Sequence, residues 1–369
     1  MQCVVVGGSL VGLSAAIALS RLGMDVTVLE RSPTRADDGG GGLGVDVALL
    51  AQVTGIAEQP PVVHGVDRDT TAWHLLQAWL EAHAVDHAGV TLHRGTQVTS
   101  VDPGDRAKQA VAVTDDGSSR HADLVVGADG TRSTVRAAVD PGHRGARYAG
   151  VLLWRSMVDE RAMPAGVALP AAGEPSREVY AGPYRLVTYL VPGAAGETGV
   201  GHRRLNLVWY DPQQGELLRD RGLLEGETIH GSLAPGTLPD PVRERLAKFA
   251  AANWPAPWRE ALGLALRDGK VFGTPIVHYE PEQLARGRAA LAGDAAHAAS
   301  PMVGGGFRQG LYDVAALTGV LTATNSPAEI PAGLSRYQEL RLRPAAQHVA
   351  VSEQATAAYL AHATHGRST

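Results

Sequence analysis

The chain has 369 residues, of which 44% are hydrophobic and 19% are charged, an ordinary globular composition with room for two packed domains. A formal net charge of -5 gives no electrostatic basis for binding nucleic acid. Cys3 is the only cysteine, no apolar run is long enough to cross a membrane, and the chain starts directly on a strand pattern, so we expect a cytoplasmic protein without disulfides or a metal site.

The first predicted elements form a strand–helix–strand unit. Apolar runs at 2–6 and 26–30 are typical of buried strands, and small and apolar residues at helical spacing predict a helix over 10–22 that ends at Gly23. After a glycine-rich loop over 34–44, the pattern predicts a helix over 70–83. Strands follow at 90–93, 97–101, 110–114 and 123–127, with a hairpin turn at 115–117.

The character of the sequence changes between residues 148 and 278. Strand-like runs at 152–158, 186–191 and 205–210 are separated by loops rich in proline and glycine, and a helix is predicted over 241–252. A strand at 289–292, a glycine-rich loop and further helices complete the chain. We therefore predict an α/β fold in which a Rossmann-like dinucleotide-binding domain, formed by 1–147 and 279–369 with C-terminal helices, carries an inserted β-sheet substrate domain over 148–278.

The first motif that carries chemistry is Gly7-Gly8-Ser9-Leu10-Val11-Gly12, between the first strand and the first helix. Its first glycine permits a tight turn, its last lets helix and strand pack closely, and backbone N–H groups at the helix start can receive a pyrophosphate. Glu30 ends the second strand, where a carboxylate accepts hydrogen bonds from ribose hydroxyls. A plain glycine-rich turn is the alternative, but strand, helix and Glu30 together favour a dinucleotide.

Two longer motifs narrow the choice of dinucleotide. Asp129-Gly130 lies within the run from Asp123 to Arg136, and Gly293-Asp294-Ala295-Ala296-His297 precedes Pro301 and Gly304-Gly305-Gly306. With the first motif, they resemble the FAD-dependent aromatic hydroxylases of the para-hydroxybenzoate hydroxylase type. The resemblance covers nearly the whole chain, because Tyr337, Arg341, Arg343-Pro344 and Ser352 fit the closing pattern of that family. Its nearest branch, judged from Trp154-Arg155 and the run 206–210, is the one that contains 2,6-dihydroxypyridine 3-hydroxylase.

The resemblance implies that the cofactor is FAD. Independently, Asp294 follows a predicted strand at a glycine-bearing turn, so its carboxylate can accept from a ribitol hydroxyl, although a helix cap is the alternative role. Glycines 304–306 open a helix whose N–H groups can face the flavin carbonyls. The predicted cofactor-binding residues are Gly7, Ser9, Leu10, Gly12, Glu30, Arg31, Asp129, Gly130, Gly293, Asp294, Pro301, Gly304, Gly305 and Gly306.

Residues of the inserted sheet are predicted to contact the substrate. The candidates are Tyr189, His202, Asn206, Tyr210 and, from the glycine-rich segment, Arg308; His297 and His278 are the candidate catalytic bases. Packing or solvent exposure is the alternative for each, because strand alternation sends only about half of such side chains inward. We expect a nitrogen heterocycle and not a simple phenol as the substrate, because ring carbonyls could accept hydrogen bonds from His202, Arg204 and His278.

The activity that the resemblance implies is a monooxygenase reaction. NADH or NADPH is the co-substrate, and O2, carried as a flavin C4a-hydroperoxide, hydroxylates an electron-rich aromatic or nitrogen-heteroaromatic ring. A flavin-dependent reductase, a Baeyer–Villiger-type oxygenase and a non-enzymatic FAD-binding protein are the alternatives. We expect a small aromatic or heteroaromatic substrate and O2 as partners, no nucleic acid and no membrane, and we allow for a homodimer.

The chain departs from the family pattern at three places. Ser9 replaces the middle glycine of the first motif, and Arg308 stands where an asparagine is common. Many members carry an arginine near Ala72 or Trp73, and its absence here leaves one phosphate contact of the family without its usual residue.

Overall fold

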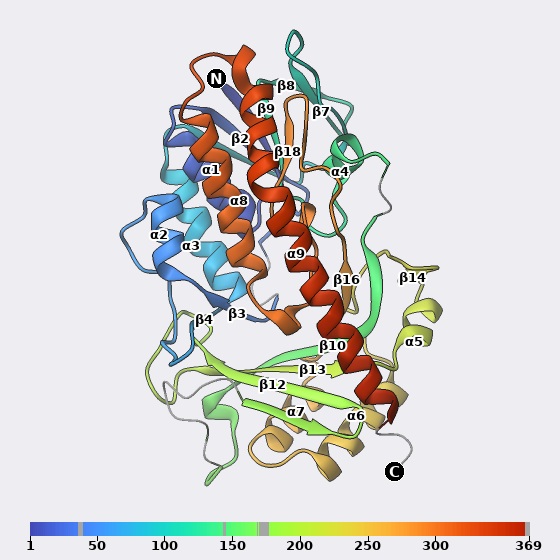
Figure 1. Ribbon diagram of the computed structural model, residues 1–369. Coiled ribbons are helices and arrows are strands. Elements are labelled where there is room, and N and C mark those ends of the chain that lie inside the picture. Colours follow the sequence, from blue (N-terminus) through green and yellow to red (C-terminus); the bar gives the residue numbers. More distant parts are fainter. Residues whose placement is uncertain (36–39, 143–144, 168, 170–176, 366–369) are drawn as a thin grey trace.

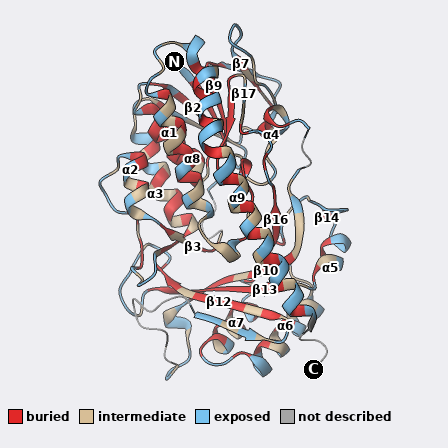
Figure 2. Cartoon of the chain, in the orientation of Figure 1, coloured by how far each residue is buried: buried red, intermediate tan, exposed pale blue. Residues whose placement is uncertain are grey.

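The computed structural model describes residues 1–35, 40–142, 145–167, 169 and 177–365. Two sheets lie at opposite ends of an elongated molecule, and the long C-terminal helix runs past both of them (Figure 1). Buried residues follow the strands of both sheets and the inward sides of the helices (Figure 2). This arrangement gives the protein two cores and a space between them.

The first sheet has the strand order β17-β18-β9-β1-β2-β5. The pairs from β18 to β5 are parallel, and only the edge strand β17 is antiparallel to its neighbour. Its central strands are runs of valine and leucine buried on both faces, which is typical of a parallel sheet covered by helices. The strands are β1 (Gln2–Val6), β2 (Asp25–Glu30), β5 (Val90–Arg94), β9 (Leu124–Gly127), β17 (Ala285–Arg286) and β18 (Ala289–Leu291).

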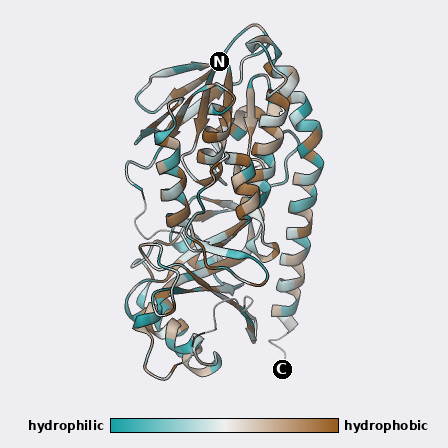
Figure 3. Cartoon of the chain, turned by 90° about the vertical axis from the view of Figure 1, so that its left-hand side faces the viewer, coloured by the Kyte–Doolittle hydropathy of each residue, from teal (hydrophilic) through white to brown (hydrophobic). Residues whose placement is uncertain are grey.

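Helices and two small sheets surround this parallel sheet. The first helix is buried almost all round, because alanine and other small residues let it pack between the sheet and its helical neighbours. Brown, hydrophobic residues accordingly concentrate on the strands of this part of the molecule (Figure 3). The helices are α1 (Leu10–Ser20), α2 (Val47–Thr54), α3 (Trp73–Asp86), α4 (Thr134–Val139), α8 (Gly306–Leu321) and α9 (Ile330–His365). One small sheet pairs β3 (Gly42–Val45) with β4 (Asp69–Ala72). The other consists of β6 (Val98–Asp102), β7 (Ala110–Thr114) and β8 (Ser119–Ala122).

The second sheet is antiparallel, and all its strands come from residues 147–278. Helices cover one of its faces, where Trp154, Trp209 and Trp254 form the centre of a second core. The strands are β10 (Arg147–Asp159), β11 (Arg177–Ala181), β12 (Tyr184–Val191), β13 (Arg204–Asp211), β14 (Leu224–Glu225), β15 (Thr228–Ile229) and β16 (Phe272–His278), and the helices are α5 (Gly215–Asp220), α6 (Asp240–Asn253) and α7 (Trp258–Arg267).

Helix α9 connects the two sheets. Near its start, the hydroxyl of Tyr337 donates a 2.6 Å hydrogen bond to the carbonyl oxygen of Leu291 in the first sheet. Near its end, the hydroxyl of Tyr359 lies 2.9 Å from the carbonyl oxygen of Tyr210 in the second sheet and 2.8 Å from that of Pro183. Both tyrosines are buried, so this helix fixes the spacing of the sheets and of the space between them.

The predicted fold class is confirmed, and the differences in detail have local causes. The helix predicted over 70–83 starts at Trp73, because residues 69–72 pair with β3 as a strand. The predicted loop over 34–44 contains a strand from Gly42, while its residues 36–39 lie outside the described residues. The hairpin turn at 115–117 joins β7 and β8 as predicted. The domain boundaries stay a prediction, and in the described part of the chain no helix is long and apolar enough to cross a bilayer.

Candidate functional site

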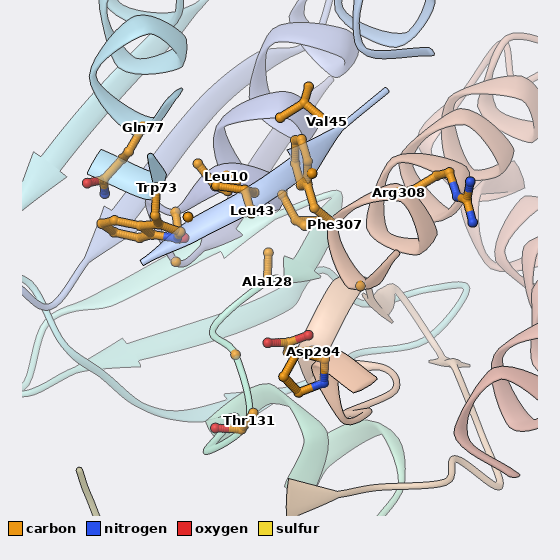
Figure 4. A pocket seen from close by; sticks show the side chains of 18 of the residues that line it. Leu10, Leu43, Val45, Trp73, Gln77, Ala128, Thr131, Asp294, Phe307 and Arg308 are labelled. Atoms are coloured by element: carbon orange, nitrogen blue, oxygen red, sulfur yellow. The ribbon is translucent and has the colours of Figure 1, made fainter. Parts of the chain in front are cut away.

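A cavity of about 1860 Å³ lies between the first sheet and the second. Its wall is formed by the turn after β1, the ends of β2 and β9, the strand β3, the start of α8 and the face of the second sheet opposite to its helices. In the part shown in Figure 4, Leu10, Leu43 and Ala128 surround the space into which Asp294 points. The volume is large enough to hold a dinucleotide and a small ring together.

The turn between β1 and α1 forms one wall of the cavity. Gly7, Ser9 and Leu10 line it, whereas Gly12 does not. A side chain on Gly12 would collide with the carbonyl oxygen of Gly7, so this glycine serves the close packing of α1 against the turn. The Ser9 side chain forms no capping hydrogen bond with α1, which leaves its hydroxyl free to donate into the cavity.

Glu30 lies beside this turn, at the end of β2. Its carboxylate accepts a 2.7 Å hydrogen bond from the N–H of Gly8 and a 2.8 Å hydrogen bond from the N–H of Ser32. Both bonds fix the carboxylate at the cavity wall, where it retains lone pairs for a ribose hydroxyl. Arg31 lines the cavity next to it.

Helix α3 supplies side chains that the sequence analysis did not assign. Gln77 donates a 3.0 Å hydrogen bond from Nε2 to the carbonyl oxygen of Gly8, and Trp73 lies beside it on the wall (Figure 4). Trp73 stands in the region where the resemblance leads one to expect an arginine. An aromatic ring and an amide therefore replace a cation on this part of the wall.

The segment after β9 brings Asp129 and Gly130 to the cavity. The carboxylate of Asp129, however, accepts hydrogen bonds from the N–H of Thr134 at 2.7 Å, the N–H of Val135 at 3.3 Å and the hydroxyl of Ser133. Its acceptors thus serve the start of α4, although burial raises its pKa. The predicted cofactor contact of Asp129 and Gly130 stays a prediction, and the backbone of this segment is the part that is left to make it.

Arg136 ties the same segment to the next motif. Its guanidinium donates to the carbonyl oxygens of Thr131 at 2.8 Å, Asp294 at 2.8 Å and Ala295 at 2.9 Å. It also lies over the ring of Tyr279, with its Cζ 3.9 Å from the ring centre. One buried side chain therefore holds together the two turns that carry the second and third motifs.

Asp294 lies in a short 3-10 turn, Gly293–Ala295, directly after β18. Its carboxylate caps no helix and accepts no hydrogen bond from the described residues. Although it lies deep in the protein, where burial raises its pKa, its side chain is accessible through the cavity. Because a carboxylate in such a place is costly without a donor, the geometry favours a ligand hydroxyl and not the helix-cap role.

The start of α8 closes this side of the cavity. Pro301, Gly304, Gly305 and Gly306 all line it. Gly305 has a left-handed backbone with φ of 78°, and the helix begins at Gly306. Since the first N–H groups of a helix have no partner within it, this end of α8 offers donors and a positive potential to carbonyl oxygens in the cavity.

The model of one protein family, described as FAD binding domain, matches residues 68–171 and 237–352. The chain belongs to this FAD-binding family. Two further models, described as pyridine nucleotide-disulphide oxidoreductase and as FAD binding domain-like, match residues 2–37 and 148–265. Together these matches extend over both predicted domains, and they identify FAD as the dinucleotide that this family binds.

Individual relatives are similar over most of their length. Aurachin C monooxygenase/isomerase of Stigmatella aurantiaca is 27% identical, with 95% of this chain and 88% of that protein covered. 2,6-Dihydroxypyridine 3-monooxygenase of Paenarthrobacter nicotinovorans is 28% identical, with 86% and 82% covered. The predicted resemblance to FAD-dependent aromatic hydroxylases, including the dihydroxypyridine branch, is confirmed by these relatives.

Solved structures share the fold. That of 2,6-dihydroxypyridine-3-hydroxylase from Arthrobacter nicotinovorans has a TM-score of 0.76 and 21% identity, and covers 98% of this chain and 93% of its own. HpxO of Klebsiella pneumoniae, complexed with FAD and uric acid, has a TM-score of 0.74 and 22% identity, with 100% and 91% covered. A Rossmann-like region with a separate antiparallel sheet is thus the architecture of FAD-binding monooxygenases.

The two histidines predicted as catalytic bases do not line the cavity. His297 is buried, and its Nε2 lies 2.7 Å from Asp313 Oδ2 on α8. Burial opposes protonation of His297, yet the Asp313 carboxylate raises its pKa. His278 is also buried, with its Nε2 3.0 Å from the hydroxyl of Ser352 on α9. Both predictions are corrected, because each ring points into a structural contact and not into the cavity.

Some of the residues predicted to contact the substrate line the cavity, and others do not. Tyr189 and Tyr210 line the cavity, as does Arg308, although Arg308 points away from Asp294 and Leu43 in Figure 4. His202 is exposed beside Arg161, away from the cavity wall. Asn206 is buried and accepts a 2.7 Å hydrogen bond at Oδ1 from the N–H of Gly42, so it positions β3 and does not reach the cavity.

Arg204 is the third polar group that favoured a heterocyclic substrate. It is buried, with its guanidinium near the carbonyl oxygen of Pro192 and near His74, and it does not line the cavity. Arg68 and Arg155 also line the cavity, and neither was predicted to do so. A signal for Arg155 existed in the Trp154-Arg155 pair, whereas nothing in the loop before β4 distinguished Arg68.

Proposed function

We propose that this protein is an FAD-dependent monooxygenase that hydroxylates an electron-rich aromatic or nitrogen-heteroaromatic ring, with NADH or NADPH as the reductant and O2 as the oxygen source. The observation that carries the proposal is one continuous cavity. It is lined by the glycine turn at Gly7, by Asp294 and, from the second sheet, by Tyr189 and Tyr210. The names of the relatives, among them hydroxylases of pyridine and benzoate rings, support this class of substrate.

We assign the cofactor side of the cavity as follows. The N–H groups at the β1–α1 turn and the hydroxyl of Ser9 would bind the pyrophosphate, Glu30 would accept from the ribose, and Asp294 would accept from the ribitol. The N–H groups at Gly305 and Gly306 would donate to the flavin carbonyls. When bound, FAD supplies the redox chemistry and the activation of dioxygen.

The second sheet would orient the substrate ring and keep water out of the cavity. Val187, Val208 and Ile276 line the cavity together with two tyrosines, Tyr189 and Tyr210. Burial raises the pKa of Tyr210 to about 12 and raises that of Tyr189 as well, so both phenols stay protonated at neutral pH and can donate to a ring oxygen. Apolar neighbours exclude water, which would otherwise divert activated oxygen into hydrogen peroxide.

The test is a turnover experiment with the FAD-loaded protein. We would measure the oxidation of NADH and NADPH and the consumption of oxygen in the presence of dihydroxypyridines and of phenols of similar size. The masses of the products are determined by mass spectrometry. We expect oxygen-dependent oxidation that is stimulated by at least one ring and a product heavier by one oxygen atom. Oxidation of NAD(P)H without oxygen would support a reductase, and no stimulation by any ring would support an FAD-binding protein without this activity.

A further inference from the structure

Trp73 is the first residue of α3, and backbone contacts hold it at the cavity wall. Its N–H donates a 3.0 Å hydrogen bond to the carbonyl oxygen of Gly41, just before β3. A methyl group on Gly40 would lie 2.7 Å from Trp73 Cβ, so the chain leading into β3 packs directly against the start of this side chain. The indole itself is half-buried and lines the cavity. These contacts fix the point from which it reaches the cavity.

The same face of α3 lies against the turn between β1 and α1. Gln77 follows Trp73 by four positions, a spacing that places both side chains on one face of a helix, and Figure 4 shows them side by side. The Nε2 of Gln77 donates a 3.0 Å hydrogen bond to the carbonyl oxygen of Gly8, within the turn to which we assign the pyrophosphate of FAD. The indole of Trp73 thus lies one helical turn away from the contact between α3 and this turn.

The indole N–H of Trp73 has no acceptor among the described residues. Trp79, on the same helix and also on the cavity wall, has its Nε1 buried without a partner, whereas the Nε1 of Trp73 is not buried in this way and stays accessible. An indole can donate one hydrogen bond and accept none, and a largely enclosed tryptophan N–H usually finds an acceptor. Trp73 therefore offers the cavity a donor, and Trp79 does not.

The charges near this donor favour an anionic acceptor from a ligand. Trp73 and Gln77 bring no charge to the wall, and the carboxylate of Glu30 is bound to the N–H groups of Gly8 and Ser32. A hydrogen bond from a neutral N–H to an anionic oxygen is charge-assisted, and it is about twice as strong as one between neutral groups. An anionic oxygen at the turn therefore gains more from this indole than a hydroxyl would.

We propose that Nε1 of Trp73 donates a hydrogen bond to an oxygen of the FAD pyrophosphate, so that the pyrophosphate is held between the β1–α1 turn and α3. This inference rests on the proposed function, because it adds a residue to the cofactor side of the same cavity. The turn supplies backbone N–H groups from one side, and the indole supplies a neutral donor from the other. Its ring also covers the pyrophosphate against water.

The first test observes the indole directly by NMR. Protein labelled with ¹⁵N-tryptophan is freed of FAD, and the indole resonances of Trp73 and Trp79 are assigned by their absence from the variants Trp73→Phe and Trp79→Phe. ADP, which carries a diphosphate, and adenosine, which carries no phosphate, are then added separately. We expect ADP to move the Trp73 resonance downfield, adenosine to leave it in place, and the Trp79 resonance to stay unchanged with both.

The second test starts from FAD-loaded proteins and needs no stable apo-protein. They are diluted, and the equilibrium between bound and free FAD is read from flavin fluorescence. Trp73→Phe keeps a ring but loses the donor, so its dissociation constant for FAD should rise about tenfold. Trp79→Phe, the matched control on the same helix, should stay within about twofold of wild type. Trp73→Arg replaces the neutral donor by a cation, so its FAD affinity should fall more steeply with added salt than that of wild type.

Three results would each overturn the proposal. They are equal shifts of the Trp73 resonance with ADP and adenosine, an unchanged FAD affinity in Trp73→Phe, and an equal loss of affinity in Trp73→Phe and Trp79→Phe. Melting temperatures of all variants identify a loss of FAD that follows from unfolding. If the ADP-dependent shift and the loss of affinity are found but no ring gains oxygen, the proposed function fails and the pyrophosphate contact stands. If a ring is hydroxylated while Trp73→Phe binds FAD like wild type, the contact fails and the proposed function stands.

Discussion

The carboxylate of Asp313 lies 2.7 Å from Nε2 of His297, behind the wall of the cavity and not on it. The same carboxylate accepts a 2.9 Å hydrogen bond from the N–H of Gly293 and a 2.8 Å hydrogen bond from Nε of Arg341. Burial alone would raise the pKa of Asp313, but the cations of His297 and Arg341 hold it below its ordinary value. Asp313 thus fixes, from α8, the turn that presents Asp294.

Asp313→Asn should therefore destabilise the protein and weaken FAD binding together. Removing the charge leaves His297 and Arg341 buried without a counter-charge, which costs about 3 kcal/mol or more of unfolding free energy. The measurement is urea unfolding of the apo-protein beside a titration with FAD. His297→Gln should be milder, because Arg341 and Gly293 keep their acceptor. If His297→Gln instead abolished turnover while stability and FAD affinity stayed normal, a catalytic role for His297 would return.

Asp294→Ala, unlike Asp313→Asn, should weaken FAD binding without destabilising the protein. Because this carboxylate accepts no hydrogen bond from the described residues, its removal should change the unfolding free energy of the apo-protein by less than about 0.5 kcal/mol. FAD affinity should fall by about 1.5–3 kcal/mol, the value of a hydrogen bond to a charged group. Calorimetric melting of the apo-protein and fluorescence titration with FAD give the two numbers. A thermal defect with unchanged FAD affinity would restore the helix-cap role.

It was predictable that the residues of the proposed cofactor side would line one cavity, because their signals are local. The turns at Gly7 and Asp294 follow strands of the parallel sheet, and Glu30 ends another one. The carboxyl ends of parallel strands meet at one edge of a sheet. Gly12 and Asp129 show the limit of the same reasoning. Their motif positions were read correctly, but whether a group faces the ligand or the neighbouring helix depends on packing that spacing alone does not contain.

The proposed substrate side was less predictable, because the positions of its side chains depend on contacts between residues far apart in the chain. Asn206 and Tyr210 lie on one strand, four residues apart, but only Tyr210 lines the cavity. Asn206 instead accepts a hydrogen bond from the N–H of Gly42, 164 positions away in the chain. His278 is likewise drawn to Ser352 on the last helix. Arg68 was missed since a turn before a short edge strand has no periodicity, and only the assembled fold brings it to Tyr189.

His278 makes stability depend on pH. Burial, with a smaller contribution from Arg147, lowers its pKa from 6.5 to about 4, so the folded protein keeps the ring neutral where the unfolded chain would protonate it. Its contribution to stability is therefore complete above pH 6.5 and is lost as the pH falls toward about 4. His348, whose pKa is also lowered, acts in the same direction, and His297, whose pKa is raised, acts in the opposite one.

Comparing wild type with His278→Gln isolates this contribution. Glutamine can still accept from Ser352 but does not titrate. Between about pH 7 and about pH 5, wild type should lose roughly 2 kcal/mol more unfolding free energy than the variant. Urea unfolding at both pH values measures the difference. Parallel losses in the two proteins would show that the ring is already protonated in the folded state.

Variants of Arg136 test whether a residue that only positions the cavity wall, without lining the cavity, affects FAD binding. Its guanidinium joins the turn at Thr131 to the turn at Asp294 through three carbonyl oxygens, at 2.8, 2.8 and 2.9 Å, and it does not line the cavity. Arg136→Met fills much of the same volume but leaves those carbonyls without a donor, so FAD affinity should fall about tenfold or more even though no cavity side chain has changed. Arg136→Lys should rescue this only in part, because one ammonium group cannot reproduce a planar fork. Flavin fluorescence titration measures both variants, and Arg243→Gln on α6 serves as the control for removal of an arginine. Normal FAD affinity in Arg136→Met would show that the two turns hold their positions independently, and that Arg136 only stabilises the fold.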